Sequence, residues 1–273
     1  MRAVRLASTV VTAAVLLGGV TACGSKGGDG AKGGDSAAGA LTGDPKAALA
    51  ASAVVMQKAG NGKIDMASPG GSDHTSGKGT ADWKDPGKPS ADLTAQVEDN
   101  KQLRIRVIGA DGYVGSDDVA ALGGKHWIKL PAGNDLGDSM LAVGQMLNPV
   151  VQLTVAAQSG KLSKVGEETV DGVKTTHLRA VEDTSVLVGA MTGLSADQRK
   201  AVQKTLEDDG TSLTVDFWLN GKQELVQYKE YGDKNGEKEA VTIKYSDLGK
   251  ADKIEAPAAG DLGSEADLLK LLS

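Results

Sequence analysis

The sequence predicts an α+β fold in which about eleven short antiparallel strands form one curled sheet covered by helices. Short apolar or alternating runs recur at close intervals, separated by Gly, Pro, Asp and Asn, as is typical of strands joined by turns. Strands and helices do not alternate along the chain, which excludes a doubly wound parallel sheet. A sheet of so many strands tends to curl, and helices must cover its apolar concave face.

The domain opens with a predicted helix between Asp44 and Gly60. Asp44 is a good N-cap, Pro45 is favoured at the first helical position, and Gly60 can end the helix. A helix with one mainly apolar face is expected to bury that face. The residues that recur at helical spacing are Ala48, Leu49, Ser52, Val55, Met56 and Ala59.

Strand-like runs follow this helix at short intervals. The clearest is Leu103-Arg104-Ile105-Arg106-Val107, whose strict alternation predicts one buried and one solvated face. Asp111-Gly112 is a hairpin signal between two of the runs. The predicted strands lie at roughly 62–68, 77–83, 90–97, 103–108, 111–116 and 125–130.

Two later stretches have helical periodicity. From Asn134 to Gly160 the apolar residues suit one or two helices, with Asn148-Pro149 as the expected break. A second helical stretch covers about 184–208, within which Ser195 and Gln198 have the spacing of a capping box.

Strands return on either side of the second helical stretch. Asp171-Gly172 and Asn220-Gly221 are predicted to join neighbouring strands. Pro257 is expected to end the sheet, and Ser264 is expected to open a short last helix. These strands lie at about 161–169, 173–181, 212–219, 224–231 and 239–248.

Residues 1–22 are organised like a lipoprotein signal peptide. Arg2 and Arg5 precede a short, interrupted apolar run, and Val20-Thr21-Ala22-Cys23 resembles the lipobox whose cysteine is acylated. The run is too short for a transmembrane helix, which needs about 20 apolar residues. A plain signal peptide cut at Ala22 would leave Cys23 as a free thiol in an oxidising compartment. We therefore expect lipidation at Cys23 and an extracytoplasmic protein, anchored to the outer face of the cell membrane.

The sequence therefore divides into three parts. Residues 1–22 are the signal peptide, residues 23–41 are the acylated cysteine with a flexible Gly-rich tether, and residues 42–273 form the domain. The tether is almost devoid of apolar side chains and cannot form a core. As a random coil it spans roughly 20–25 Å, which keeps the domain near the membrane.

Composition and charge exclude several kinds of partner. Cleavage of the signal peptide would remove Arg2 and Arg5 and leave 28 of the 30 basic residues. Against 36 acidic residues, the mature chain would have a net charge of −8. Nucleic-acid binding depends on Lys and Arg and is therefore not expected. A broad electrostatic attraction to anionic lipid is not expected either, so the acyl anchor must hold the protein. Aromatic residues make up only 3% of the chain, so aliphatic residues and Met must fill the core.

The sequence carries no metal or cofactor motif. Cys23 is the only cysteine, and His74, His126 and His177 are not spaced as metal ligands. Gly71–Gly79 resembles a phosphate-binding loop but has one residue too many and lacks the final Ser or Thr, so a hairpin loop is expected. No metal site or cofactor is predicted.

The sequence also carries no catalytic motif. The mature chain has no Gly-x-Ser-x-Gly or Ser-x-x-Lys motif. Three adjacent carboxylate pairs lie beside turns, where solvated acids are expected: Asp117-Asp118, Glu167-Glu168 and Asp208-Asp209. No enzyme is predicted. A hydrolase with a triad from dispersed residues stays open as a third hypothesis.

Several segments resemble the LolA-like half-barrel, in particular the LprG/LppX lipoproteins of actinobacteria. Besides the lipobox they are Asp111-Gly112-Tyr113, the Lys125–Lys129 strand, Val170–Val173 leading to His177, and Asp216–Leu219 before Asn220-Gly221. The resemblance covers about 42–255. It implies an apolar cavity that is lidded by helices and from which acylated molecules are carried or presented.

Twelve apolar residues are candidates to line such a cavity. Met suits an adaptable lining, but ordinary packing of helices on the sheet is an open alternative. Trp83, Trp127 and Trp218 could be core anchors or stand at the cavity mouth. The candidates are Ile105, Val107, Ile128, Leu130, Met140, Met146, Leu147, Val150, Leu187, Met191, Val215 and Phe217.

The favoured function is a membrane-anchored lipoprotein that binds, carries or presents lipids or other acylated molecules in the cell envelope. Burial of apolar chains supplies the affinity, at roughly 0.8 kcal/mol per CH₂. The alternative is an envelope sensor or protein-interaction module with the same fold and no transported ligand, whose partner is an envelope protein.

Overall fold

The computed structural model describes most of the chain from residue 43 onward. The described residues are 43–68, 75–85, 88–96, 102–109, 111–117, 119–120, 122–130, 140, 144–192, 194–264 and 266–267. The predicted signal peptide, Cys23 and the tether lie outside the described residues. So do His74, Asp118 and the Leu268–Leu272 part of the predicted last helix.

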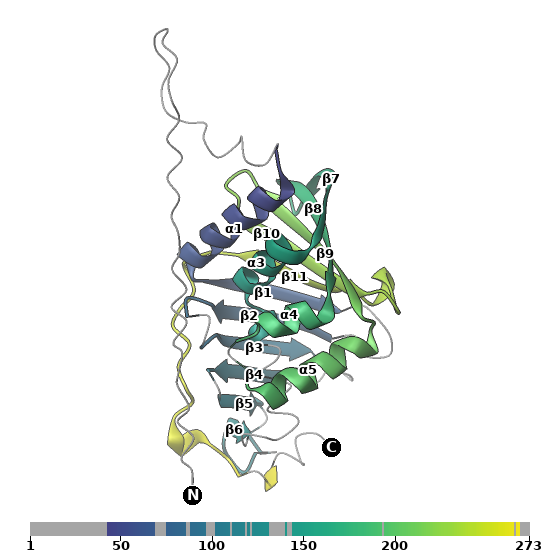
Figure 1. The fold of residues 1–273 in the computed structure, drawn as a ribbon. Helices are drawn as coiled ribbons and strands as arrows, with labels where there is room; N and C mark the ends of the chain where they lie inside the picture. The colour runs from purple at the N-terminus through teal and green to yellow at the C-terminus, as the bar shows by residue number, and fades with distance from the viewer. Residues whose placement is uncertain are drawn as a thin grey trace, which may run out of the picture. The chain divides into compact units, whose positions relative to one another are not determined.

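In the described residues, an open sheet of eleven antiparallel strands forms the framework, as the sequence predicted (Figure 1). Strands β1 to β6 follow one another as a meander, and β7 to β11 form a second one. The pair β1–β11 joins the two halves, which leaves β6 and β7 at the edges. The first half comprises β1 (Asn61–Ser68), β2 (Thr75–Asp82), β3 (Ser90–Gln96), β4 (Gln102–Ile108), β5 (Asp111–Gly115) and β6 (Trp127–Leu130); the second comprises β7 (Lys161–Val170), β8 (Val173–Asp183), β9 (Ser212–Asn220), β10 (Leu225–Gly232) and β11 (Val241–Ser246).

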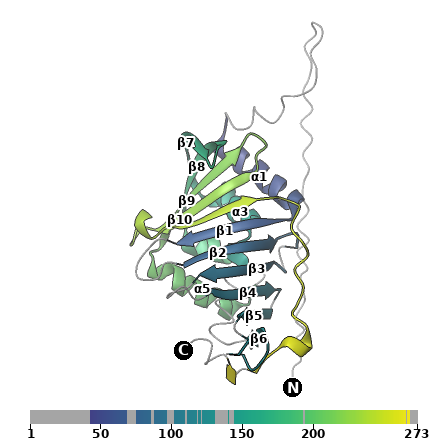
Figure 2. The same cartoon turned by 180° about the vertical axis from the view of Figure 1, so that it is seen from behind.

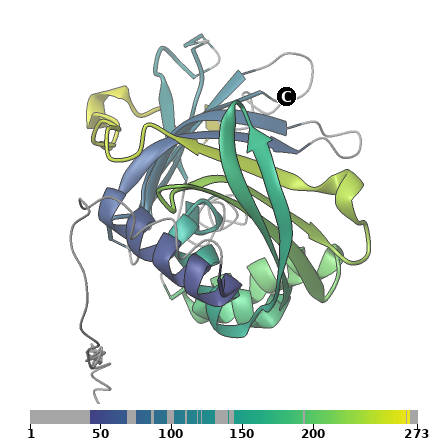
Figure 3. The ribbon, with the colours of Figure 1, turned by 90° about the horizontal axis from the view of Figure 1, so that it is seen from above.

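The α-helices α1 (Pro45–Ala59), α3 (Pro149–Ser159), α4 (Thr184–Ala190) and α5 (Ala196–Asp208) lie on one face of this sheet. Figure 2 shows the opposite face with the strands in front, and Figure 3 shows the strands curving round the helices. We call the helix-covered face the inner face and the other the outer face. Two short 3₁₀ helices, η3 (Glu237–Glu239) and η4 (Ala259–Asp261), flank β11 in the sequence.

The helix ends lie where the sequence places them. Asp44 accepts a hydrogen bond from the Lys46 amide, and Gly60 ends α1 in the left-handed conformation, with a φ of 73°. Asn148 caps α3, which begins at Pro149. The stretch predicted at 184–208 is two helices rather than one, because the chain leaves α4 at Met191 and Ser195 opens α5 with the predicted capping box.

Several turns and strand ends differ from the prediction. Asp111-Gly112 belongs to β5: Ile108 pairs with Asp111, so the turn lies before Asp111, where Gly109 has a φ of 58°. β6 begins at Trp127 and not at residue 125. Asn220-Gly221 opens a longer loop, because Leu219 pairs with Leu225 and Gln223 carries the positive φ. The predicted hairpin at Asp171-Gly172 is confirmed, with φ positive at both residues.

Strand alternation divides the side chains between the two faces. On β4 the residues Leu103, Ile105 and Val107 belong to the apolar core, whereas Arg104 and Arg106 lie on the outer face. Gly79, the last glycine of the segment that resembles a phosphate-binding loop, lies inside β2. A Cβ there would come within 1.9 Å of the Asp92 carbonyl oxygen, so the close approach of β2 and β3 requires glycine.

Candidate functional site: the inner face of the sheet

The twelve predicted lining residues gather on the inner face. All of them belong to a single apolar cluster or pack against it, which joins the sheet to the helices. Nine are buried, and Ile105, Met146 and Val150 are half-buried. The cluster brings together β4, β6 and β9 with α3 and α4, which lie far apart in the sequence. The lining of a cavity by these residues stays a prediction.

The centre of this cluster is densely packed. Leu187 on α4, Met191 just after it, and Val215 and Phe217 on β9 are each 0% exposed. Phe217 meets Tyr228 of β10 edge to face, with ring centroids 5.6 Å apart.

The three tryptophans have different roles. Trp83 is a core anchor: it is 1% exposed, and its indole nitrogen donates to the Met56 carbonyl oxygen of α1 at 2.7 Å. Trp127 and Trp218 are buried on the outer face, outside the main apolar cluster. Both are buried, as expected of anchors, but they do not belong to the cluster that joins the sheet to the helices.

An unpredicted group of polar side chains lies on the inner face. Glu182 of β8 is 3% exposed, and neither of its carboxylate oxygens has a hydrogen-bond partner. The Tyr228 hydroxyl donates to Glu230, and both residues are buried on β10. Their positions could have been found from strand alternation, because Glu182 follows Leu178 and Ala180 on the same face, and Glu230 follows Tyr228.

Burial governs the ionisation of this group. It raises the pKa of Glu182 to about 8, and the charge of Glu230 adds to the effect. Burial also raises the pKa of Glu230, although the hydrogen bond from Tyr228 opposes the shift. These carboxyl groups therefore retain protons at pH values where a solvated glutamate is ionised.

A groove between α1 and α3 leads along the outside of the helical layer. It has a volume of about 420 Å³ and is lined by Ala53, Val54, Gln57, Lys58, Val150 and Thr154. Val54 is 69% exposed. Val150 is one of the predicted lining residues, so the groove adjoins the apolar cluster.

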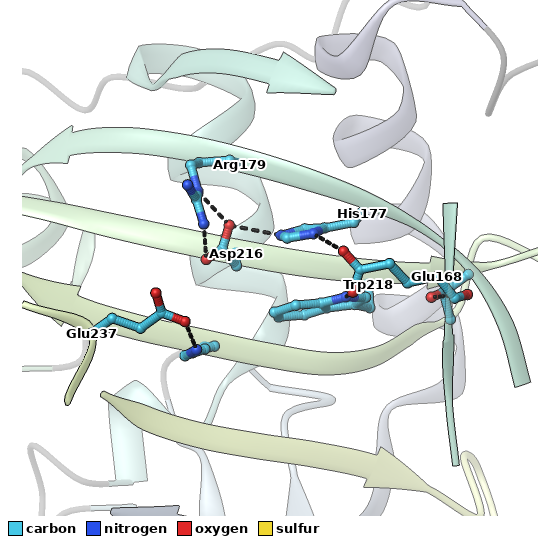
Figure 4. Close-up of polar contacts among 8 residues, drawn as sticks. Glu168, His177, Arg179, Asp216, Trp218 and Glu237 are labelled. Atoms are coloured by element: carbon cyan, nitrogen blue, oxygen red, sulfur yellow. Dashed lines mark hydrogen bonds and ion pairs between the residues drawn. The ribbon is translucent and has the colours of Figure 1, made fainter. Parts of the chain in front are cut away.

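The outer face carries a network of hydrogen-bonded charges (Figure 4). His177 lies between two carboxylates: Nδ1 is 2.7 Å from Glu168 and Nε2 is 2.8 Å from Asp216. Arg179 donates to both oxygens of Asp216, at 2.7 and 2.9 Å. The Trp218 indole donates to Glu168 at 2.9 Å. Glu168, expected to be a solvated acid beside a turn, is therefore a partner in this network.

The network shifts the pKa values of its members. Burial favours neutral forms of His177 and Asp216, but their mutual hydrogen bond and those to Glu168 and Arg179 prevail. The pKa of His177 is raised and the pKa of Asp216 is lowered. The hydrogen bond from Trp218, and then that from His177, lower the pKa of Glu168. The network has the balanced charges of a structural ion cluster.

The segment after β11 crosses the outer face. Arg106 donates to the Glu255 carbonyl oxygen at 2.8 Å, and His126 contacts Asp261 at 2.8 Å. A polar groove of about 550 Å³ lies between this segment and the sheet. Trp127 lies in it with the guanidinium carbons of Arg104 and Arg106 each 4.5 Å from its ring centroid.

Within the described part of the chain, no cluster of His, Cys, Asp and Glu side chains could hold a metal ion. No helix of that part is both long and apolar enough to cross a membrane.

Comparison with solved structures decides the fold family. LprF from Mycobacterium bovis superposes with a TM-score of 0.52 at 15% identity, over 79% of this chain and 97% of LprF. This is the LolA-like fold of the LprG/LppX lipoproteins. The mycobacterial lipoprotein LppX is also similar, with a TM-score of 0.48 at 15% identity, over 78% of this chain and all of LppX. The fold that the hairpin segments predicted is confirmed.

Sequence relatives of this LolA-like chain come from Streptomyces. An uncharacterized 31.2 kDa protein of Streptomyces griseus, encoded between rplA and rplJ, is 31% identical over 194 residues, which are 67% of this chain and 63% of that protein. A Streptomyces coelicolor protein that carries the name putative lipoprotein is 28% identical over 164 residues, 57% of this chain and 48% of that protein. The chain thus spans less than two thirds of either relative. No protein-family model matches the sequence.

Proposed function

We propose that this chain is an envelope lipoprotein that binds lipids or other acylated molecules on its inner face and carries or presents them. The observation that carries the proposal is the apolar cluster between the curved sheet and its helices. The cluster brings aliphatic and Met side chains of both halves of the sheet to one surface. The fold shared with LprF and the lipoprotein name of a Streptomyces relative support this assignment.

In this proposal the helices admit the ligand by moving. The buried side chains of α1, α3 and α4 are mostly small or apolar, so few directional bonds, such as that from Trp83 to α1, break when these helices separate from the sheet. Each CH₂ of a ligand chain buried there gains roughly 0.8 kcal/mol. The protein performs no covalent chemistry on the ligand.

Cys23 supplies the membrane anchor in this proposal. Acylation there, followed by the tether of residues 24–41, holds the domain at the outer face of the cell membrane. Replacing Cys23 by Ser should release the protein from the membrane fraction. Retention of the Cys23→Ser variant in washed membranes would contradict an acyl anchor at this position.

Native mass spectrometry with solvent extraction tests the carrier function. The sample is the full-length chain with Cys23→Ser, which carries no acyl group of its own, made in a lipid-containing host. We expect adducts of lipid mass at near one-to-one occupancy. A clean protein mass, even after incubation with diverse lipids, would instead favour the sensor or interaction module, whose envelope partner crosslinking can identify.

A further inference from the structure

The inner face carries a polar patch amid its apolar side chains. The register pairs Glu182 of β8 with Leu213 of β9, and Val215 of β9 with Glu230 of β10. Glu182 and Glu230 therefore lie on the same face, separated by one strand. Tyr228 lies on that face too, and its hydroxyl donates to Glu230. We call Glu182, Tyr228 and Glu230 the inner polar patch.

Glu182 is the unsatisfied member of the patch. Its side chain is buried, with 3% exposed, and neither carboxylate oxygen has a hydrogen-bond partner. A buried polar group without a partner destabilises a fold, and Leu or Met could fill the same volume. A buried acid without a partner points to a task other than packing, because unsatisfied buried groups concentrate at functional sites.

The inner polar patch lies on the same face of the sheet as the predicted lining residues. Val215 and Phe217 lie on the same face of the neighbouring strand, and Leu187 projects toward the core from α4, the helix that begins directly after β8. A ligand chain lying along those residues would bring its polar end next to Glu182.

The chemistry of the patch selects the kind of polar end. Burial raises the pKa of Glu182 to about 8 and so favours its neutral form, and a neutral carboxyl group both donates and accepts hydrogen bonds. A hydroxyl group does the same, so the two are complementary. A phosphate is disfavoured, because the burial that favours a neutral Glu182 also opposes the entry of a charged group.

We propose that Glu182, with Glu230 beside it, binds the hydroxyl groups of an uncharged acylated ligand whose chain lies along the inner face. This inference rests on the proposed function and specifies its ligand class.

Two probes with the same acyl chain test the inference. 1-Monooleoylglycerol carries two hydroxyl groups, whereas methyl oleate carries none. Affinities for the full-length Cys23→Ser chain are measured by native mass spectrometry over a concentration series of each probe. We expect about tenfold tighter binding of 1-monooleoylglycerol, the contribution of a hydrogen bond to a buried partner.

Variants assign the preference to Glu182. Glu182→Leu should weaken binding of 1-monooleoylglycerol about tenfold and leave methyl oleate bound at least as tightly. Glu182→Gln retains a donor and an acceptor and should keep the preference. Glu167→Leu, at a side chain that is 77% exposed on β7, is the matched control and should change neither affinity. If Glu182→Leu does not fold, Glu182→Met, which retains the length of the side chain, replaces it.

The outcomes separate this inference from the carrier function. Equal binding of both probes by the parent chain, or an unchanged preference in Glu182→Leu, overturns the inference and leaves the carrier function standing. Binding of neither probe overturns both.

Discussion

The indole ring of Trp218 stacks on the imidazole ring of His177, with centroids 4.2 Å apart and planes inclined by 20°. The two residues are directly paired across β8 and β9 on the outer face. Stacking orients the imidazole so that each ring nitrogen reaches a carboxylate, Glu168 on one side and Asp216 on the other (Figure 4). Three strands, β7, β8 and β9, are joined by side chains in this way.

Stability should depend on pH through His177. Its pKa is raised in the folded state, so its contribution is fully present below the unfolded-state value of 6.5 and is lost as the pH rises through the folded-state value. We expect His177→Gln to lower the free energy of unfolding by about 1–2 kcal/mol at pH 6, and by less at pH 9. Urea unfolding at both pH values measures the difference. An equal loss at pH 6 and pH 9 would show that the ionised imidazole is not what stabilises the network.

Glu182 should have a pH dependence of its own. Its pKa is about 8 in the folded protein and 4.5 in the solvated group. The burial of this carboxyl group therefore does not reduce the free energy of unfolding below pH 4.5, and reduces it increasingly as the pH rises to 8. Glu182→Gln should therefore raise the free energy of unfolding by a few kcal/mol at pH 8 and have little effect at pH 4.5. Urea unfolding at the two pH values measures this.

The matched control for Glu182 is Glu167→Gln, whose side chain is 77% exposed. It should leave the free energy of unfolding unchanged at both pH values. If the free energies of unfolding of the wild-type and Glu182→Gln proteins changed in parallel with pH, Glu182 would be solvated in solution, contrary to its burial.

Gly79 should not tolerate a side chain. An alanine Cβ would lie 1.9 Å from the Asp92 carbonyl oxygen, so β2 and β3 must separate. We expect Gly79→Ala to lower the free energy of unfolding by more than about 2 kcal/mol. Gly166→Ala, where a Cβ meets nothing within 4 Å, should change it by less than about 0.5 kcal/mol. Equal midpoints of thermal unfolding for the two variants would contradict the close approach.

The amount of lipid bound on the inner face should depend on the size of the side chain at position 187. Leu187→Trp adds a bulky ring at a fully buried position, whereas Val186→Trp adds the same ring one residue earlier on α4, where the side chain is 43% exposed. We expect Leu187→Trp to displace bound lipid and Val186→Trp to retain it, as measured by native mass spectrometry. Val150→Trp is a second displacing variant, at a half-buried position.

Folding of these tryptophan variants is checked by circular dichroism, because overpacking a core position costs about 1–3 kcal/mol. Unchanged lipid occupancy in a folded Leu187→Trp variant would place the ligand away from this part of the inner face.

The sequence by itself determined the helix starts, the number of strands and the fold. Caps and alternation are local properties, so Asp44, Asn148 and Ser195 marked helix starts correctly and Leu103–Val107 showed which side chains face the core. The turn assigned to Asp111-Gly112 was wrong because a Gly-containing dipeptide marks a hairpin only when the register places it outside the strand.

Only the tertiary structure decided what the polar residues do. His177, Asp216 and Glu168 lie on three different strands, and their spacing in the sequence gave no sign that one imidazole would join them. Trp127 and Trp218 have large aromatic side chains yet lie on the outer face, because the face on which a strand residue lies depends on register. Glu182 and Glu230 likewise meet only through the pairing of β8, β9 and β10. Contacts between strands depend on the alignment of distant segments, and the local pattern of a single chain does not contain that alignment.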